Sequence, residues 1–345
     1  KGPVPSGRSL ANSARGGENF PTLNSEQEIT ATLDDPRAAV ADDVRARRAG
    51  HAMALTSALL WSAVFTLLRW VQGQGVGAVE LYLARFGVFT IGLVLVGLVR
   101  RPDLRSFGWR GFGLVAVMSV LAGPGYQILQ NYGAVGTDSG LMAMLHTTQA
   151  LHTAWMAAIL LRERFYLADA LAIVLASAGI GLVLSGGKWD YETLRYPGAL
   201  CIVAMIAGLC NALVRRLLRR VRTWDLVWLM YLLGFIFSLP LISRGAIEQW
   251  RAMSPRVWLA VLYLAIPAQL VAILLWYAAL KRLRAATVSF YTFVIMIGAA
   301  AWGWLRGEIP SWIDIIGMGV VMAALAINIR ARPADKPSAV TIEEV

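Results

Sequence analysis

The sequence is poor in charged residues and in the side chains that usually carry enzyme chemistry. Only 15% of its 345 residues are Asp, Glu, Lys or Arg, and it contains three histidines and two cysteines. Soluble domains carry about 25% charged residues, whereas here 57% of the residues are hydrophobic and the mean hydropathy is +0.58. This composition indicates that lipid, rather than water, surrounds much of the chain.

The few cysteines and histidines form no recognisable catalytic or metal-binding pattern. Cys201 and Cys210 fall in one predicted helix, about 13.5 Å apart along its axis, which exceeds the roughly 7 Å that a disulfide spans between Cα atoms. The sequence contains no GxxxxGK[ST] phosphate loop, no GxSxG nucleophile elbow and no metal-ligand spacing. We therefore expect no enzymatic activity, no metal site and no resident cofactor.

Apolar runs dominate the chain after residue 50 and are joined mostly by short loops. A helix needs about 20 apolar residues to cross a hydrocarbon core about 30 Å thick, and most of the runs reach that length. The predicted spans are 51–71, 79–99, 111–131, 139–161, 166–185, 197–214, 224–243, 257–279, 286–305 and 311–329. The sequence thus predicts an all-α integral membrane protein with ten transmembrane helices.

The formal net charge of +11 has an uneven distribution along the chain. The basic residues gather at positions 45–48, 100–110, 215–222, 281–284 and 330–336, which ten spans place on one side of the membrane. The positive-inside rule then predicts that both termini are cytoplasmic and that the protein lies in the cell (inner) membrane. The charge is a topology signal, so we do not expect nucleic acid as a partner.

The two ends of the chain differ in composition from the apolar part. Residues 1–50 are rich in Gly, Pro, Ser and Asn, which predicts a disordered cytoplasmic tail. Residues 331–345 are similarly polar and predict a cytoplasmic C-terminal tail. The N-terminal stretch has no apolar h-region, so no cleavable signal peptide is expected.

The two halves of the apolar part resemble each other. Shifting the sequence against itself aligns "NYGAVGTDSGLMAML" (131–145) with "WYAALKRLRAATVSF" (276–290). Each half contains five predicted spans, and an odd number makes the second half enter the membrane from the opposite side. We therefore predict two inverted five-helix repeats, residues 51–185 and 197–330, an architecture of secondary transporters.

Acidic residues recur at matching places in the two halves. Glu163 and Glu308 follow the fourth and ninth predicted spans, and Asp169 and Asp314 stand near the starts of the fifth and tenth. We interpret the glutamates as structural turn residues, with a contact to substrate as the alternative. The aspartates suit helix N-termini, where the helix dipole favours negative charge.

Prolines also match, in the third and eighth predicted spans, at Pro124 and Pro267. Proline removes a backbone donor and kinks a helix. The pair predicts two kinks, which serve either as hinges or only as packing features.

The segment "QNYGAVGTDSGLMAML", followed by "LLRERFYLADALAIVLASAGIGLVL", resembles the drug/metabolite transporter superfamily, EamA type. "WYAALKRLRAATVSF" with "GWLRGEIPSWIDIIGMGVVMAALAI" is similar to a second copy of the same pattern. The resemblance covers residues 50–330 and implies a secondary transporter of small solutes that hydrolyses no ATP. Such proteins often export amino acids or other metabolites.

The sequence departs from that family's pattern at three places. Ala150 and Ile295 stand where the family usually has proline, and Arg162 stands where it has glycine. Gly307, the counterpart of Arg162 in the second half, keeps the pattern.

Polar residues inside apolar spans are functional candidates, because a polar group in hydrocarbon needs a partner or a cavity. The alternative is hydrogen bonding between helices, worth about 0.6 kcal/mol on average. The residues predicted to contact a solute are His146, Gln149, Gln127, Asn131 and Tyr291, with Trp61, Asn211 and Gln269 as further candidates. His146 can also carry a proton in the physiological pH range.

Arg85 lies about two turns into the second predicted span. It has three open interpretations: attraction of an anionic group, an ion pair with Glu80, or an outward reach toward the membrane surface. We favour the outward reach.

The sequence therefore predicts a secondary transporter, acting as an exporter, of a small metabolite, amino acid or drug-like solute by alternating access. Proton coupling through His146 and facilitated diffusion both remain open. The expected partners are a small-molecule solute and the lipid bilayer, for a monomer or homodimer. The alternatives are a flippase of a lipid-linked substrate and a non-transporting membrane receptor.

Overall fold

The computed structural model describes residues 36–161, 166–185, 191–218, 220–283, 288 and 291–331. The chain divides into two units, residues 1–45 and 46–345. In the first unit the described residues, 36–45, are helical. The helix contacts that position the candidate site all lie in the second unit.

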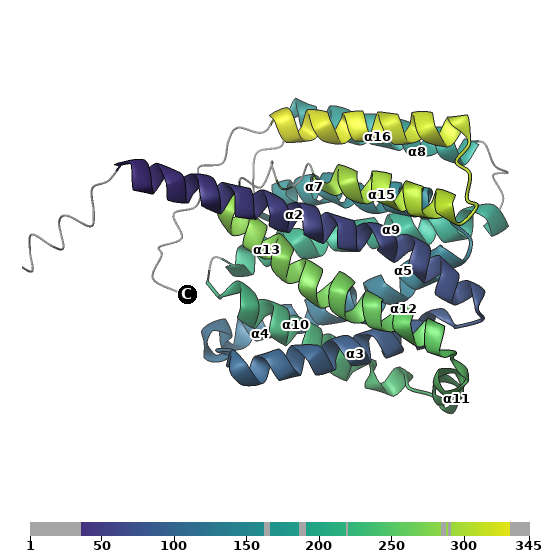
Figure 1. Ribbon diagram of the computed structural model, residues 1–345, viewed down its shortest axis with the longest axis horizontal. Helices are drawn as coiled ribbons and strands as arrows, with labels where there is room; N and C mark the ends of the chain where they lie inside the picture. Colours follow the sequence, from purple (N-terminus) through teal and green to yellow (C-terminus); the bar gives the residue numbers. More distant parts are fainter. Residues whose placement is uncertain are drawn as a thin grey trace, which may run out of the picture. The chain divides into compact units, whose positions relative to one another are not determined.

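Helices make up all the regular secondary structure of the described residues (Figure 1). The α-helices are α2 (Pro36–Gly73), α3 (Ala78–Val99), α4 (Gly108–Val120), α5 (Tyr126–Val135), α6 (Ser139–Thr147), α7 (Gln149–Leu161), α8 (Leu167–Ser185), α9 (Tyr191–Leu218), α10 (Thr223–Ser238), α11 (Arg244–Ala252), α12 (Pro255–Ala265), α13 (Ala272–Arg282), α15 (Tyr291–Leu305) and α16 (Trp312–Ala331). Shorter turns are η1 (Arg105–Phe107), η2 (Leu121–Gly125), η3 (Leu239–Leu241) and η4 (Ile266–Val271).

Seven of the described helical segments are long and apolar enough to cross a membrane. They are Val44–Gly73, Ala78–Val99, Arg105–Val135, Leu167–Leu184, Leu194–Val214, Thr223–Leu241 and Pro255–Ala279. The apolar helices Tyr291–Leu305 and Trp312–Ile327 are shorter and coincide with the predicted spans 286–305 and 311–329. The sequence and the structure therefore agree on an all-helical, multi-pass membrane protein.

The predicted span 139–161 is interrupted at Thr148, between α6 and α7. The hydroxyl of Thr148 donates to the carbonyl oxygen of Leu145 at 2.6 Å, and that of Thr147 donates to Met144 at 2.8 Å. Threonine hydroxyls that bond the preceding turn compete with the helical backbone and bend helices. This interruption thus occurs without a proline.

The prolines in the third and eighth predicted spans lie in π-helical turns. Pro124 lies in η2 and Pro267 in η4. Gly123, beside Pro124, has φ −80° and ψ −107°, which departs from helical geometry. It lies so close to α10 that a Cβ atom built there would be 3.2 Å from the Cα of Gly234. Two glycines therefore allow the bent segment to pack against α10.

The segment around Pro267 is joined to α2 by hydrogen bonds. The indole of Trp61 donates to the carbonyl oxygen of Ala268 at 2.7 Å, and the hydroxyl of Ser57 donates to that of Ala272 at 2.8 Å. Both are hydrogen bonds between helices, which contribute to helix association in a membrane. These bonds hold α2 along the α12–η4–α13 segment.

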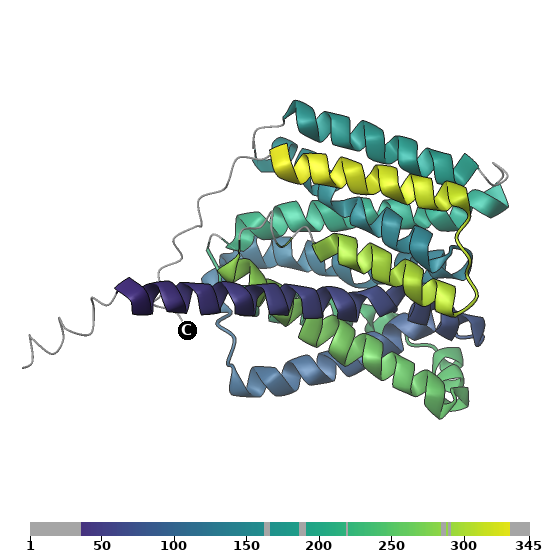
Figure 2. The same ribbon diagram turned by 45° about the horizontal axis from the view of Figure 1, so that its top comes forward.

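Helices α8 and α16 lie side by side, as both views show (Figures 1 and 2). Small residues form their contact: a Cβ atom at Gly179 would lie 2.9 Å from the carbonyl oxygen of Gly317, and one at Gly317 would lie 2.2 Å from Val183. Small residues at an interface let helix backbones approach closely in membranes. The α3–α10 and α6–α15 pairs also pack together.

Replacement of Gly179 by Val is expected to lower the unfolding temperature of the purified protein, because the added side chain separates α8 from α16. The control is Gly181→Val on the same helix, where a Cβ atom meets no other atom within 4 Å. Circular dichroism during heating measures both variants. Equal unfolding temperatures for the two would contradict the close contact.

Candidate functional site

Buried and half-buried polar side chains from five segments gather among the apolar helices. We call them the central polar cluster: Arg85 (α3), Tyr126, Gln130 and Asn131 (α5), His146 (α6), Tyr231 (α10) and Gln269 (η4). Polar groups in such a position are costly and are usually functional. The cluster is therefore the first candidate for a solute site.

One part of the cluster joins α5 to α6. The hydroxyl of Tyr126 and the Nε2 atom of His146 form a hydrogen bond of 2.7 Å, and Gln130 donates to the same hydroxyl at 3.3 Å. The edge of the His146 ring meets Phe65 of α2, with 5.4 Å between ring centroids. His146 thus has one ring nitrogen bound inside the protein and an aromatic wall from α2.

The other part of the cluster surrounds Arg85, whose residue surface is only 5% exposed. Its guanidinium donates to the side-chain oxygen of Asn131 at 3.5 Å and to that of Gln269 at 3.4 Å. The favoured interpretation from the sequence, an outward reach of Arg85, is wrong. The reason is that Arg85 lies on the face of α3 that packs against the two segments with π-helical turns, where the side-chain amides of Asn131 and Gln269 accept its hydrogen bonds.

Asn131 and Gln269 are themselves held in place. The amide of Asn131 donates to the carbonyl oxygen of Ala78 at 2.9 Å, and its backbone oxygen accepts a hydrogen bond from Gln72. The amide of Gln269 donates to the hydroxyl of Tyr231 at 3.4 Å. Both acceptors of Arg85 therefore belong to a network that links α2, α3, α5, η4 and α10.

Gln127 lies one turn before Asn131 on α5 and is 4% exposed. Its side-chain oxygen has no hydrogen-bond partner among the described residues. A buried acceptor without a partner costs about 1–3 kcal/mol. Gln127 therefore offers unused hydrogen-bonding capacity beside the cluster.

The structure places the other predicted residues outside the cluster. The indole of Trp61 donates to the carbonyl oxygen of Ala268 in η4, and its ring lies tilted against that of Trp276, with ring centroids 5.1 Å apart. Asn211 is exposed and bonds Thr153 at 3.5 Å. Gln149 is half-buried, and its side chain bonds no described residue.

Tyr291 does not lie beside His146, although the repeat register aligns the two residues. Its hydroxyl bonds the Nδ1 atom of His51 at 2.9 Å. Since His146 meets Phe65, and His51 lies about 21 Å away from Phe65 along α2, the two side chains occupy different depths.

The solute-contact residues predicted from the sequence do not include Tyr126, Gln130 or Tyr231. The position of Tyr126, four residues before Gln130, places both on one face of a helix, and this spacing was the available signal. Tyr231 has no such signal, because its neighbours on α10 are apolar. Only the packing of α10 against the kinks brings it to Gln269.

A second polar group lies at one end of the helices and links α2, α6 and the turn before α16. We call it the Arg69 network: Arg69 pairs with Asp138 and, at 3.3 Å, with Glu308, whose other oxygen accepts a hydrogen bond of 2.8 Å from the backbone of Ser139. Glu308 follows Gly307, whose φ of +88° suits glycine. Glu308 thus stands in the turn before α16 and also contacts α2 and α6. Its counterpart in the first half, Glu163, lies outside the described residues.

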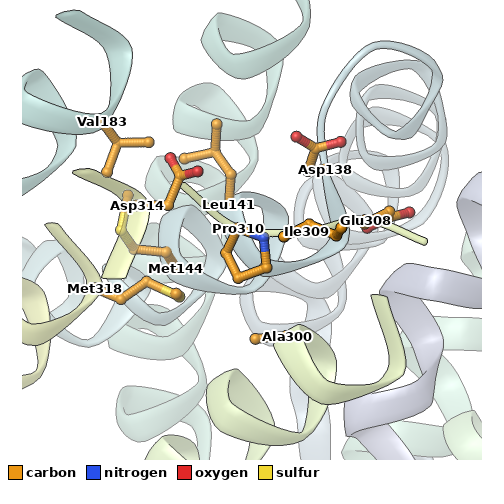
Figure 3. A pocket seen from close by; sticks show the side chains of 11 residues that line it. Asp138, Leu141, Met144, Val183, Ala300, Glu308, Ile309, Pro310, Asp314 and Met318 are labelled. Atoms are coloured by element: carbon orange, nitrogen blue, oxygen red, sulfur yellow. The ribbon is translucent and has the colours of Figure 1, made fainter. Parts of the chain in front are cut away.

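A small pocket adjoins the Arg69 network (Figure 3). Asp138, Leu141, Met144, Glu308, Pro310 and Met318 are among the residues that line it, and its volume is about 50 Å³. Ligand pockets typically have about 300–1,000 Å³, so this pocket admits water rather than a metabolite. We therefore do not take it as the solute site.

Asp169 and Asp314 accept hydrogen bonds at helix N-termini. Asp169 accepts from the backbone of Tyr166 at 2.9 Å, and Asp314 accepts from the backbone and hydroxyl of Ser311, both at 2.8 Å. These contacts confirm the structural interpretation of both aspartates. Within the described ranges, no three His, Cys, Asp or Glu side chains are grouped so that they hold a metal ion.

The apolar helices and the buried polar cluster define a multi-pass helical membrane protein with a polar interior. The model of the EamA-like transporter family matches residues 48–185 and again residues 197–330. The chain therefore belongs to the EamA-like transporter family and is a transporter rather than an enzyme.

Two relatives support this assignment, and one solved structure shares the fold. The chain is 24% identical to a "Probable terminal-alkyne amino-acid exporter" of Streptantibioticus cattleyicolor, over 79% of this chain and 93% of that protein. It is 23% identical to the "Uncharacterized transporter YetK" of Bacillus subtilis, over 59% of this chain and 63% of that protein. A crystal structure with 20% identity shares the fold, with a TM-score of 0.55 over 81% of this chain and 96% of its own.

Substitution of Glu308 by Gln is expected to open the end that carries the Arg69 network, because it removes the charge that pairs with Arg69. The probe is a cysteine at Leu141, which lines the adjoining pocket, in a chain whose Cys201 and Cys210 are replaced by Ser. The rate of labelling by a maleimide should rise severalfold.

The matched control is Glu248→Gln on α11, an exposed glutamate outside the network. It should leave the labelling rate of the Leu141→Cys probe unchanged. An unchanged rate in Glu308→Gln as well would show that the ion pairs do not close this end.

Proposed function

We propose that this chain is a secondary exporter of a small organic solute and that the central polar cluster is its solute site. The observation that carries the proposal is the gathering of buried Arg85 and Asn131 with half-buried Gln269, Tyr126 and His146 among apolar helices, with hydrogen bonds that cross from helix to helix. Such groups mark substrate pathways in membrane proteins. The transporter lies in the cell membrane, with both termini cytoplasmic.

The transporter consists of ten spans arranged as two inverted five-helix repeats, residues 51–185 and 197–330. Three observations support this arrangement: the family model matches twice, the π-helical turns lie at matching places, and helices at equivalent positions pack in pairs. These pairs are α3 with α10, α6 with α15, and α8 with α16. Pairing of equivalent helices is what a two-fold axis between the repeats requires.

Alternating access follows from this arrangement. The Arg69 network closes one end of the helices, and the kinks at Pro124 and Pro267 supply the two points at which the segments beside the cluster bend. Rocking of one repeat against the other exposes the cluster to each side in turn. His146 carries the proton if transport is coupled to a pH gradient.

The solute is a small metabolite, amino acid or drug-like molecule rather than a lipid-linked substrate. A flippase needs a polar path for a head group at its lipid-facing surface. The groove between α3 and α10 has a volume of about 370 Å³, but among its lining residues, which are Gly87, Thr90, Ile91, Val94, Leu95 and Phe235, only Thr90 has a polar side chain. The name of the Streptantibioticus relative makes amino acids the first class to assay.

Transport in proteoliposomes tests the proposal. The panel contains leucine, phenylalanine, the terminal-alkyne amino acid propargylglycine and cationic drugs, each assayed with and without a pH gradient. We expect saturable movement of one class, reduced about tenfold or more by His146→Ala, since loss of about 1.4 kcal/mol of binding corresponds to a factor of ten.

His152→Ala is the matched control, because His152 lies on the neighbouring α7 and bonds Trp155 at 3.1 Å, outside the cluster. It should transport as the wild type does. Absence of saturable movement of every panel member by folded protein would overturn the proposed function. An equal loss of transport in the His146→Ala and His152→Ala variants would show that the central polar cluster is not the solute site.

A further inference from the structure

The inference concerns the guanidinium of Arg85 and rests on the proposed function of the cluster as a solute site. Arg85 is buried, and among the described residues it has no carboxylate partner. A buried charge that lacks an opposite charge destabilises a protein, because desolvation is not offset. A transporter therefore gains nothing in stability from keeping an arginine here.

The hydrogen bonds of Arg85 are too long to offset that cost. Its acceptors, the side-chain oxygens of Asn131 and Gln269, lie at 3.5 and 3.4 Å. Ordinary N–H···O bonds measure about 2.7–3.2 Å, and those between a guanidinium and a carboxylate about 2.7–2.9 Å. The two amides hold the guanidinium in position without satisfying it.

We propose that Arg85 binds an anionic group of the solute, namely a carboxylate. The planar guanidinium offers two parallel N–H groups that match a carboxylate in a bidentate pair, and no described side chain of the protein supplies that carboxylate. Such a pair supplies the opposite charge that the buried arginine lacks. The transported class is therefore a small organic carboxylate.

The place of Arg85 also links binding to movement. Asn131 belongs to α5, which follows the kink at Pro124, and Gln269 lies within the π-helical turn at Pro267. A carboxylate on Arg85 replaces the long bonds to these two amides, so its arrival acts on both bent segments at once. Gln127, whose side-chain oxygen has no partner, lies about 6 Å from Asn131 along α5 and can accept a hydrogen bond from a donor on the same solute.

The first test needs no ligand. If Arg85 is kept for binding, Arg85→Gln removes an unpaired buried charge, and the unfolding temperature of the full chain in lipid nanodiscs should rise by a few degrees. If Arg85 instead holds α5 and η4 together, the same substitution should lower that temperature. A lower unfolding temperature overturns the proposal.

The second test compares ligands that differ in the carboxylate alone or in the amine alone. Leucine and 4-methylpentanoate carry a carboxylate, whereas leucinamide does not. We expect the two carboxylates to raise the unfolding temperature of the wild type more than the amide does. This difference should vanish in Arg85→Gln and persist in part in Arg85→Lys.

Arg110→Gln is the matched control, because Arg110 is exposed on α4 and packs over Trp109. It should keep the preference for carboxylates. Equal stabilisation of the wild type by carboxylates and amide, or a preference that survives in Arg85→Gln, overturns the proposal.

Transport of the same ligands separates this inference from the proposed function. Carboxylate binding that depends on Arg85, without transport of any solute, supports the inference and refutes the transporter. Transport of an uncharged solute at the same rate by wild type and Arg85→Gln supports the transporter and refutes the inference. Transport of carboxylates that falls at least about tenfold in Arg85→Gln supports both.

Discussion

Hydrocarbon offers no hydrogen-bonding partner, and the structure depends on how this chain meets that constraint. Where the helices are regular, the backbone satisfies itself. At η4 and the start of α13, Trp61 and Ser57 of α2 donate further hydrogen bonds to the carbonyl oxygens of Ala268 and Ala272. The contact between α2 and the α12–η4–α13 segment is therefore specific, because moving α2 along its axis would break both hydrogen bonds.

The same constraint applies to the polar side chains, which also need partners inside the membrane. Tyr126 and His146 satisfy each other, and Asn131 is satisfied by the start of α3. Arg85 and Gln127 stand apart, because the former lacks an opposite charge and the latter has an acceptor without a partner among the described residues. A protein selected only for stability would replace both by apolar residues. We propose that a solute completes the network.

The two polar groups of the protein differ in what they connect. The Arg69 network joins helix ends, where the charges of Arg69, Asp138 and Glu308 find one another close to the edge of the apolar region. The central cluster joins helix interiors and brings two bent segments to one arginine. Contacts between helix ends and contacts between helix interiors can break and form separately, as the proposed alternating access requires.

The sequence by itself determined the features that depend on local chemistry. Apolar length gives helices suited to a membrane, prolines coincide with the π-helical turns at η2 and η4, and Asp169 and Asp314 accept bonds at helix starts. Tertiary structure alone decided which side chains meet. It buries Arg85 instead of turning it outward, places Tyr291 beside His51 rather than near His146, and brings Tyr231 to Gln269. The physical reason is that periodicity shows which residues share a face of one helix, whereas contact between helices depends on their depth, rotation and bending.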